Sequence, residues 1–126
     1  MSKTNKNLKR IRTGVKALIV NNGKILVVSE NVVRGDKKVV IQDFPGGGMD
    51  YGESLEIALK REVMEEIGLE IKIGKVVGAW DFVIDFHQDK SKTGVQIVCI
   101  GYQCKVVGEP KIDLTKNPAQ EDIFNC

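Results

Sequence analysis

One helical segment stands between stretches of β-type sequence, and this order limits the folds open to the chain. From Ser54 to Ile67 the apolar residues recur with helical spacing. Ser54 is suited to cap the start of this helix and Gly68 to end it. On both sides of the segment β-branched residues are frequent, so the chain is expected to form strands, one helix and then more strands.

The expected strands are set off by turn signals. The sequence Asn21-Asn22-Gly23 tolerates positive φ and lies between two apolar runs, which predicts a hairpin. Pro45 and the three glycines after it end the next strand. The predicted strands cover residues 15–20, 24–28 and 38–44, two pieces within 70–86, and most of 94–107.

The length and composition describe one folded domain. The chain has 126 residues, of which 42% are hydrophobic and 29% charged, and these values argue against disorder. The formal charge of +2 argues against a nucleic-acid or membrane platform. The basic excess lies at the start, so we predict a flexible basic arm over residues 1–12 and one domain over 13–126, truncated at its C-terminus if a closing element follows.

Several function classes find no support in the residues. No apolar stretch approaches the roughly 18 residues of a membrane helix, and Met1–Asn7 lacks the apolar core of a signal peptide, so a cytoplasmic protein is expected. Cys99, Cys104 and Cys126 form no C-x-x-C pair, which disfavours zinc and a disulfide framework. At least one of Cys99 and Cys104 is expected to be a small core residue, and His87 is a poor candidate for a catalytic base.

Three carboxylates share one stripe of the expected helix. The face that begins at Leu55 continues as Glu62, Glu65 and Glu66, which are spaced i, i+3 and i, i+4. Like charges this close destabilise a helix, and a bound divalent cation removes that cost. Grouped hard oxygen ligands suit Mg²⁺ or Mn²⁺. The alternative, a solvated acidic face, is weakened because the other faces of the helix carry apolar residues.

A glycine-rich loop precedes the helix. Residues 46–52 hold four glycines, and such a loop brings main-chain groups against an anion at a helix N-terminus. Arg61 lies four residues before Glu65 and next to Glu62, where it can orient the carboxylates; the alternative is an ordinary surface ion pair. Together with Glu53 these residues predict a strand, loop and helix unit for phosphate and metal.

At this point the sequence resembles the Nudix family. Gly47, five residues, Glu53, seven residues and then Arg61–Leu69 match the Nudix box, G-x5-E-x7-R-E-U-x-E-E-x-G-U with U aliphatic. Nine fixed or restricted positions agree over 23 residues, and Phe44-Pro45-Gly46 just before them fits the same family. Outside the box the resemblance is one of layout.

The resemblance implies a fold and a reaction. The implied fold is an α/β/α sandwich around a mixed β-sheet, of α/β or α+β class. The implied reaction is metal-dependent hydrolysis of a nucleoside diphosphate linked to another moiety. The metal ligands carry over to Glu62, Glu65, Glu66 and the Gly46 carbonyl, and the phosphate loop to Gly46, Gly47 and Gly48.

The remaining roles carry over less completely. Arg61 becomes the orienting partner of the carboxylates, and Glu53 steadies the loop. The general base stays open between Glu62, Glu66 and Glu121, with Glu109 as a further alternative; the other reading of the two late acids is loop solvation.

The substrate is a small nucleotide of undetermined identity. The downstream markers of subgroups that cleave ADP-ribose, dinucleoside polyphosphates and NADH are missing, because residues 84–87 are Ile, Asp, Phe and His. Elimination therefore favours nucleoside triphosphates, oxidised ones included. The alternatives are a non-catalytic nucleotide-binding module, an RNA-end-processing protein that uses the basic arm, and a diphosphate isomerase, for which no suited cysteine is found. A homodimer stays open, since dimers are common in the family.

Overall fold

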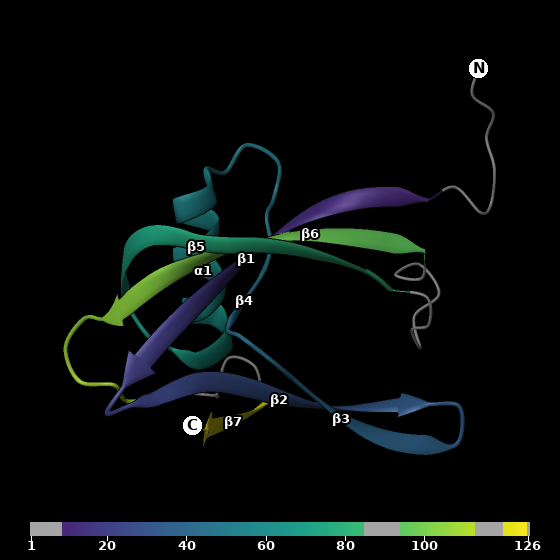
Figure 1. Cartoon of the computed structure of the whole chain (residues 1–126), viewed down its shortest axis with the longest axis horizontal. Helices are drawn as coiled ribbons and strands as arrows, with labels where there is room; N and C mark the ends of the chain where they lie inside the picture. The colour runs from purple at the N-terminus through teal and green to yellow at the C-terminus, as the bar shows by residue number, and fades with distance from the viewer. Residues whose placement is uncertain (1–8, 85–93, 113–119, 126) are drawn as a thin grey trace.

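The computed structural model describes residues 9–84, 94–112 and 120–125, the last of these ranges for the backbone alone. Seven strands and one helix form in these ranges (Figure 1). Their bounds are β1 (Arg10–Asn21), β2 (Lys24–Arg34), β3 (Lys37–Asp43), β4 (Gly46–Gly48), α1 (Leu55–Ile67), β5 (Ile71–Ile84), β6 (Val95–Val106) and β7 (Gln120–Asn125). No helix in the described ranges is long and apolar enough to cross a membrane.

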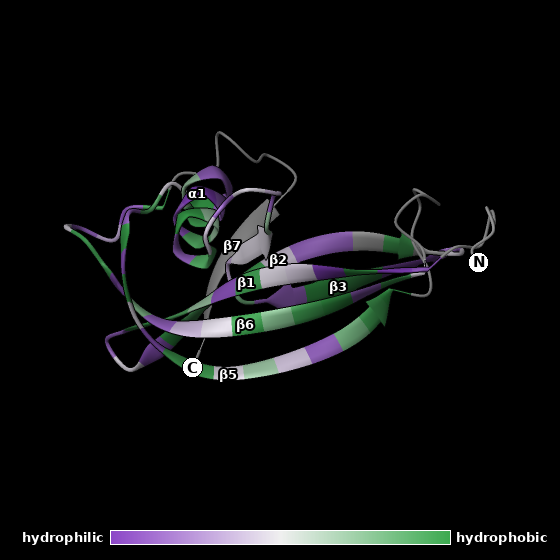
Figure 2. Ribbon diagram, turned by 90° about the horizontal axis from the view of Figure 1, so that it is seen from above, coloured by the Kyte–Doolittle hydropathy of each residue, from purple (hydrophilic) through white to green (hydrophobic). Residues whose placement is uncertain are grey.

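The strands form a mixed sheet of the expected α+β class. Its order is β3-β2-β1-β6-β5, with β4 paired to β1 and β7 paired to β2. The pair β1 and β6 is parallel, and the other pairs are antiparallel. Helix α1 lies against one side of the layer that contains β1, β6 and β5 (Figure 2). The described residues thus confirm the mixed sheet and supply a helical layer on one of its faces.

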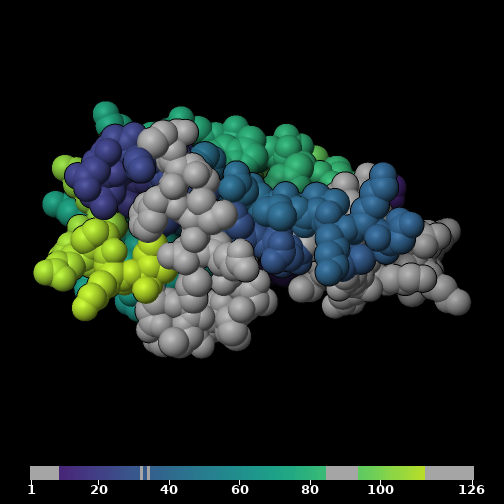
Figure 3. Space-filling model, turned by 90° about the horizontal axis from the view of Figure 1, so that it is seen from below, coloured from purple at the N-terminus to yellow at the C-terminus, as the bar shows by residue number. Residues whose placement is uncertain are grey.

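The hairpin and the helix follow the sequence prediction. Asn21 pairs with Lys24, and between them Asn22 and Gly23 have φ of 54° and 75°, as the turn sequence requires. Ser54 Oγ accepts a hydrogen bond of 3.1 Å from the Ile57 amide, which caps the start of α1. Strand β2 extends six residues beyond its predicted end, whereas β3 is shifted by one residue from its predicted bounds. The two strands form the long hairpin that lies across the face shown in Figure 3.

Two boundary predictions are wrong. The segment before the hairpin is not a flexible arm up to residue 12, because Arg10 already pairs with Val95 and β1 continues from there. Arginine fits in such a strand because its long aliphatic stem can pack along the sheet while its charged end reaches solvent. The region expected to hold two strands is one strand, β5, with register shifts between Ile73 and Gly78. The shifts mark a bulge, which interrupts the alternation that sequence reading relies on.

The core lies between α1 and the sheet. Its buried residues come from one face of β1, from β2, from α1 and from β6; they include Val15, Ala17, Ile19, Leu26, Ala58, Leu59, Val63, Ile67, Tyr102 and Cys104. Because side chains alternate along a strand, Gly14, Lys16 and Leu18 point to the opposite face of β1. Cys99 and Cys104 are both buried in the core, as expected for at least one of them, and burial raises the pKa of each thiol.

Candidate functional site

Strand β4 brings the glycine loop against β1 and α1. Gly46 pairs with Lys16, Gly47 with Val15 and Gly48 with Gly14. Gly46 has φ of 139°, and a Cβ at this position would run into the Val15 carbonyl. A Cβ at Gly47 would lie 2.5 Å from Glu62 Oε2. Position 46 therefore needs glycine, whereas a side chain at Gly47 would displace the Glu62 carboxylate, because the loop backbone lies directly against it.

Arg61 holds the loop and the helix together. Its Nε donates to Glu53 Oε2 at 2.6 Å and its Nη2 to Glu53 Oε1 at 2.8 Å, a bidentate pair. Nη2 also donates to the Gly48 carbonyl at 3.1 Å. Nη1 donates to Glu62 Oε1 and to Glu65 Oε2, each at 3.1 Å. One guanidinium thus orients three carboxylates and fixes the end of β4.

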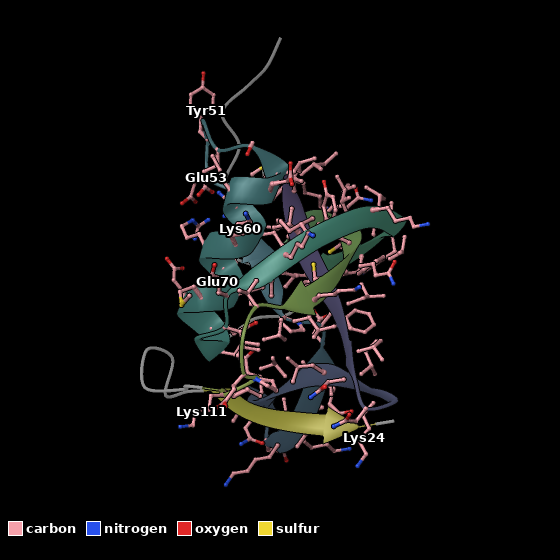
Figure 4. The ribbon with its side chains drawn as sticks, turned by 90° about the vertical axis from the view of Figure 1, so that its left-hand side faces the viewer. Lys24, Tyr51, Glu53, Lys60, Glu70 and Lys111 are labelled. Atoms are coloured by element: carbon pink, nitrogen blue, oxygen red, sulfur yellow. The ribbon has the colours of Figure 1, made fainter. Side chains whose placement is uncertain are left out.

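Arg61 and Glu53 each stabilise the charged form of the other. The bonds from Arg61, together with the Asp50 amide, hold the pKa of Glu53 at about 2. The same pair raises the pKa of Arg61, chiefly through Glu53. Glu53 lies beside the start of α1, while Tyr51 projects outward from the loop (Figure 4). Both groups of the pair are therefore charged at neutral pH, and the clamp persists there.

Glu66 and Glu62 are the half-buried members of the carboxylate stripe. Glu66 Oε1 accepts from the Gly46 amide at 3.0 Å, yet burial raises its pKa to about 7. Burial also raises the pKa of Glu62, against the lowering effect of Arg61. Glu65 is more exposed, with 58% of its side-chain surface open to solvent. The stripe therefore carries negative charge that nearby cations only partly compensate.

The donor set fits a hard divalent cation. In the ranges described, no three Asp, Glu, His or Cys side chains already converge into a cation cage. The reason is that Glu62 and Glu65 turn toward Arg61, while Glu66 bonds the Gly46 amide. The uncompensated charge, the carboxylate oxygens and the adjacent main-chain carbonyl are what Mg²⁺ or Mn²⁺ takes, with waters completing the coordination.

Lys16 lines two cavities, of which the smaller contains Glu66 of this stripe. The larger, about 340 Å³, is lined by residues of β1, β4, β5 and β6. The smaller, about 250 Å³, contains Glu66 and Gly46 together with residues of β2 and β3. The Lys16 ammonium donates to Asp43 Oδ2 at 2.8 Å, and only 12% of its side chain is exposed. Sequence reading missed both Lys16 and Asp43, because only the pairing of β1 with β4 brings them to the stripe.

Glu121 and Glu109, the two candidate acids near the C-terminus, lie in different parts of the fold. Glu121 lies in β7, where its Cα pairs with that of Ser29 on β2, and its side chain is outside the described residues. Glu109 follows β6 and lines neither cavity. His87 is likewise outside the described ranges.

Four aromatic residues of the chain lie in different surroundings. Phe44 and Trp80 contact each other edge to face, with ring centroids 6.1 Å apart. Tyr102 is buried in the core, whereas Phe82 lines the larger cavity. Of these four residues, Phe82 is the one placed where a ligand in that cavity would touch it.

Comparison with known proteins agrees with this geometry. The chain matches the family described as NUDIX domain over residues 10–124. It is 32% identical over 124 residues to the nucleoside triphosphatase NudI of Enterobacter sp. (strain 638), which covers 90% of this chain and 80% of that protein. An RNA pyrophosphohydrolase of Actinobacillus pleuropneumoniae serotype 5b (strain L20) is 38% identical over 61 residues, 46% of this chain and 30% of that protein.

A solved structure shows the same fold. The MutT Nudix hydrolase from Burkholderia pseudomallei has a TM-score of 0.68 and 24% identity, over 91% of this chain and 82% of that chain. The family match spans nearly the whole chain, including the loop, the helix and the Arg61 clamp. The chain therefore belongs to the Nudix family, whose enzymes are hydrolases that generally use divalent metal ions.

Proposed function

We propose that this chain is a pyrophosphohydrolase that uses Mg²⁺ or Mn²⁺ to cleave the pyrophosphate linkage of a small nucleotide, with nucleoside triphosphates, oxidised ones included, favoured as substrates. The observation that carries the proposal is the Arg61 clamp. It holds a glycine backbone, suited to phosphate, against Glu62 and Glu65, two of the carboxylates suited to metal. A non-catalytic module is disfavoured because every charged residue of the box is present.

In this proposal Glu62, Glu65, Glu66 and the Gly46 carbonyl hold the metal. When bound, a divalent cation there neutralises phosphate oxygens and lowers the pKa of a bound water. The chain itself supplies position: β4 and α1 fix the distance between the phosphate loop and the carboxylates, and preorganised groups of this kind need no rearrangement during the reaction.

Arg61 and Glu53 act as positioning residues. Their bidentate pair fixes the guanidinium, which in turn fixes Glu62 and Glu65. The proton of the attacking water goes to a carboxylate, for which Glu62, Glu66 and Glu121 stay the candidates. The first two are supported by their contacts with the loop. Glu121 stays a candidate from the sequence, because its Cα partner on β2 is Ser29, which does not line the smaller cavity.

Support for a triphosphate substrate comes from two sides. The Enterobacter relative, whose match covers 90% of this chain, is named a nucleoside triphosphatase. The sequence markers of several other substrate subgroups are missing. The homodimer and the cytoplasmic location stay predictions.

A substrate panel tests the proposal. The purified chain is incubated with nucleoside triphosphates, oxidised triphosphates, ADP-ribose, dinucleoside polyphosphates, a nucleotide sugar and a 5′-triphosphorylated RNA, with Mg²⁺, Mn²⁺ or EDTA. Release of phosphate or pyrophosphate is measured by chromatography. We expect metal-dependent turnover that is fastest with a nucleoside triphosphate. Failure to hydrolyse any member, with a folded protein, would contradict the proposal.

A further inference from the structure

The larger cavity has one cationic wall. Arg10, Arg12, Gly14 and Lys16 occupy alternate positions of β1 and therefore share the face that points away from the core. All four line the cavity of about 340 Å³, together with Gly47 and Gly48 of the glycine loop. No acidic residue of the described ranges is part of its lining.

The lining that β5 and β6 contribute, beside β1 in the same sheet, is apolar. It is formed by Phe82 and Ile84 of β5 and by Val95 and Ile97 of β6. Phe82 is 41% exposed, so its ring is open to a ligand. A cavity with this division fits a molecule that is anionic along one edge and apolar or planar along the other, which is the division between the phosphates and the base of a nucleotide.

We propose that Arg12 and Lys16, with Arg10 beyond them, bind phosphate oxygens outside the cleaved linkage, so that the chain prefers substrates with three or more phosphates over nucleoside diphosphates joined to a neutral group. This inference rests on the proposed function and adds to it the residues that set substrate class. Arginine suits the role because its planar group can bond two phosphate oxygens at once.

Lys16 is the end of the row nearest the carboxylate stripe. It is the Cα partner of Gly46, whose amide bonds Glu66. Its ammonium donates to Asp43 Oδ2 and to the Phe44 carbonyl, both in the lining of the smaller cavity. Arg12 lies four residues earlier on the same face, about 13 Å away along a strand. The positive side chains therefore follow β1 away from the cleavage site and do not surround that site.

The Arg12 guanidinium has N–H groups available to bond a ligand. Its Nη2 makes a hydrogen bond of 3.4 Å to the Met49 carbonyl, which is long for this type of bond. The side chain is exposed and makes no ion pair that fixes it elsewhere in the described residues. Replacing it should therefore alter anion binding without disturbing the core.

The test compares Arg12→Gln with a matched control, Lys24→Gln. Lys24 is an exposed cation at the start of β2, and it lies at the opposite end of the molecule from Tyr51 (Figure 4). The first measurement is calorimetric binding of inorganic tripolyphosphate to each protein in EDTA. We expect Arg12→Gln to weaken binding about tenfold, the effect of one charge-assisted hydrogen bond, and Lys24→Gln to leave it within twofold. Equal affinities for wild type and Arg12→Gln would overturn the inference.

The second measurement compares two substrate classes. For Arg12→Gln, kcat/KM should fall about tenfold with a nucleoside triphosphate and stay within twofold with a nucleotide sugar. Arg12→Lys should recover part of the triphosphate rate. An equal fall with both classes would mean that Arg12 has no role in choosing between them. If the wild type hydrolyses nothing, the proposed function fails, but the tripolyphosphate measurement still decides whether the row binds phosphate.

Discussion

Replacing Glu66 by glutamine should stabilise the metal-free protein at alkaline pH. Burial raises the pKa of Glu66 from 4.5 to about 7, although the Gly46 amide bonds its carboxylate. The folded chain therefore binds more protons than the unfolded chain between these two pH values. Stability consequently falls as the pH rises from about 4.5 to about 7, and it stays low above that range. Glutamine keeps an acceptor for the Gly46 amide and carries no charge to bury.

The size of the effect follows from the pKa. A rise from 4.5 to about 7 corresponds to about 3 kcal/mol, at about 1.4 kcal/mol for each pH unit. Glu66→Gln should thus be more stable than the wild type by up to about 3 kcal/mol at pH 8, and nearly equal to it at pH 4.5. With an m-value of about 1.5 kcal/mol/M, this difference moves the urea midpoint by about 2 M.

The assay is urea unfolding followed by fluorescence of Trp80, at pH 4.5, 6 and 8 in EDTA. Glu70→Gln is the matched control, because Glu70 is exposed and lies just after the same helix. The control should follow the wild type at every pH. Adding Mg²⁺ at pH 8 should then stabilise the wild type more than Glu66→Gln, since the cation compensates the charge that the variant lacks. A wild type and Glu66→Gln with the same pH dependence in EDTA would refute the reasoning.

Three further substitutions separate the site from the scaffold. Gly47→Ala places a Cβ 2.5 Å from Glu62 Oε2, so turnover should fall at least tenfold, and unchanged turnover would show that this contact is irrelevant to the reaction. Arg61→Lys loses the bidentate pair with Glu53, so kcat should fall about a hundredfold while circular dichroism stays native; a rate near that of wild type would rule out the clamp as a positioning device. Ser54→Ala removes the helix cap and should cost about 1 kcal/mol in urea unfolding, with kcat of the folded protein unchanged.

Features that depend on neighbouring residues could be predicted from the sequence. The hairpin turn at Asn22 and Gly23 follows from residues that accept positive φ. The helix bounds follow from Ser54, whose hydroxyl caps the first turn, and from Gly68 at the other end, with φ of 70°. The carboxylate stripe follows from helical spacing alone, and the contact between Glu66 and the loop agrees with it.

Features that depend on long-range pairing could not be predicted in this way. The parallel pairing of β1 with β6 joins residues more than eighty positions apart, and no local pattern encodes it. In the sequence Lys16 is a single lysine in an apolar strand, with no sign of a functional role. Only the pairing of β1 with β4 places it beside the site. The pairing of β1 with β6 carries Arg10 and Arg12 out of the expected arm and into the wall of a cavity. The candidate carboxylates were therefore accessible from the sequence, whereas the residues proposed to choose among substrates were not.

The central claim is that the helix carboxylates carry a metal-dependent hydrolysis. Its most direct test is the turnover of a nucleoside triphosphate by the wild type, Glu65→Gln and Glu66→Gln, each in Mg²⁺ and in EDTA. The account predicts turnover by the wild type in Mg²⁺ alone, and a loss of several orders of magnitude in both variants, whose circular dichroism stays native. Turnover that is unchanged in both variants would contradict the assignment of these carboxylates.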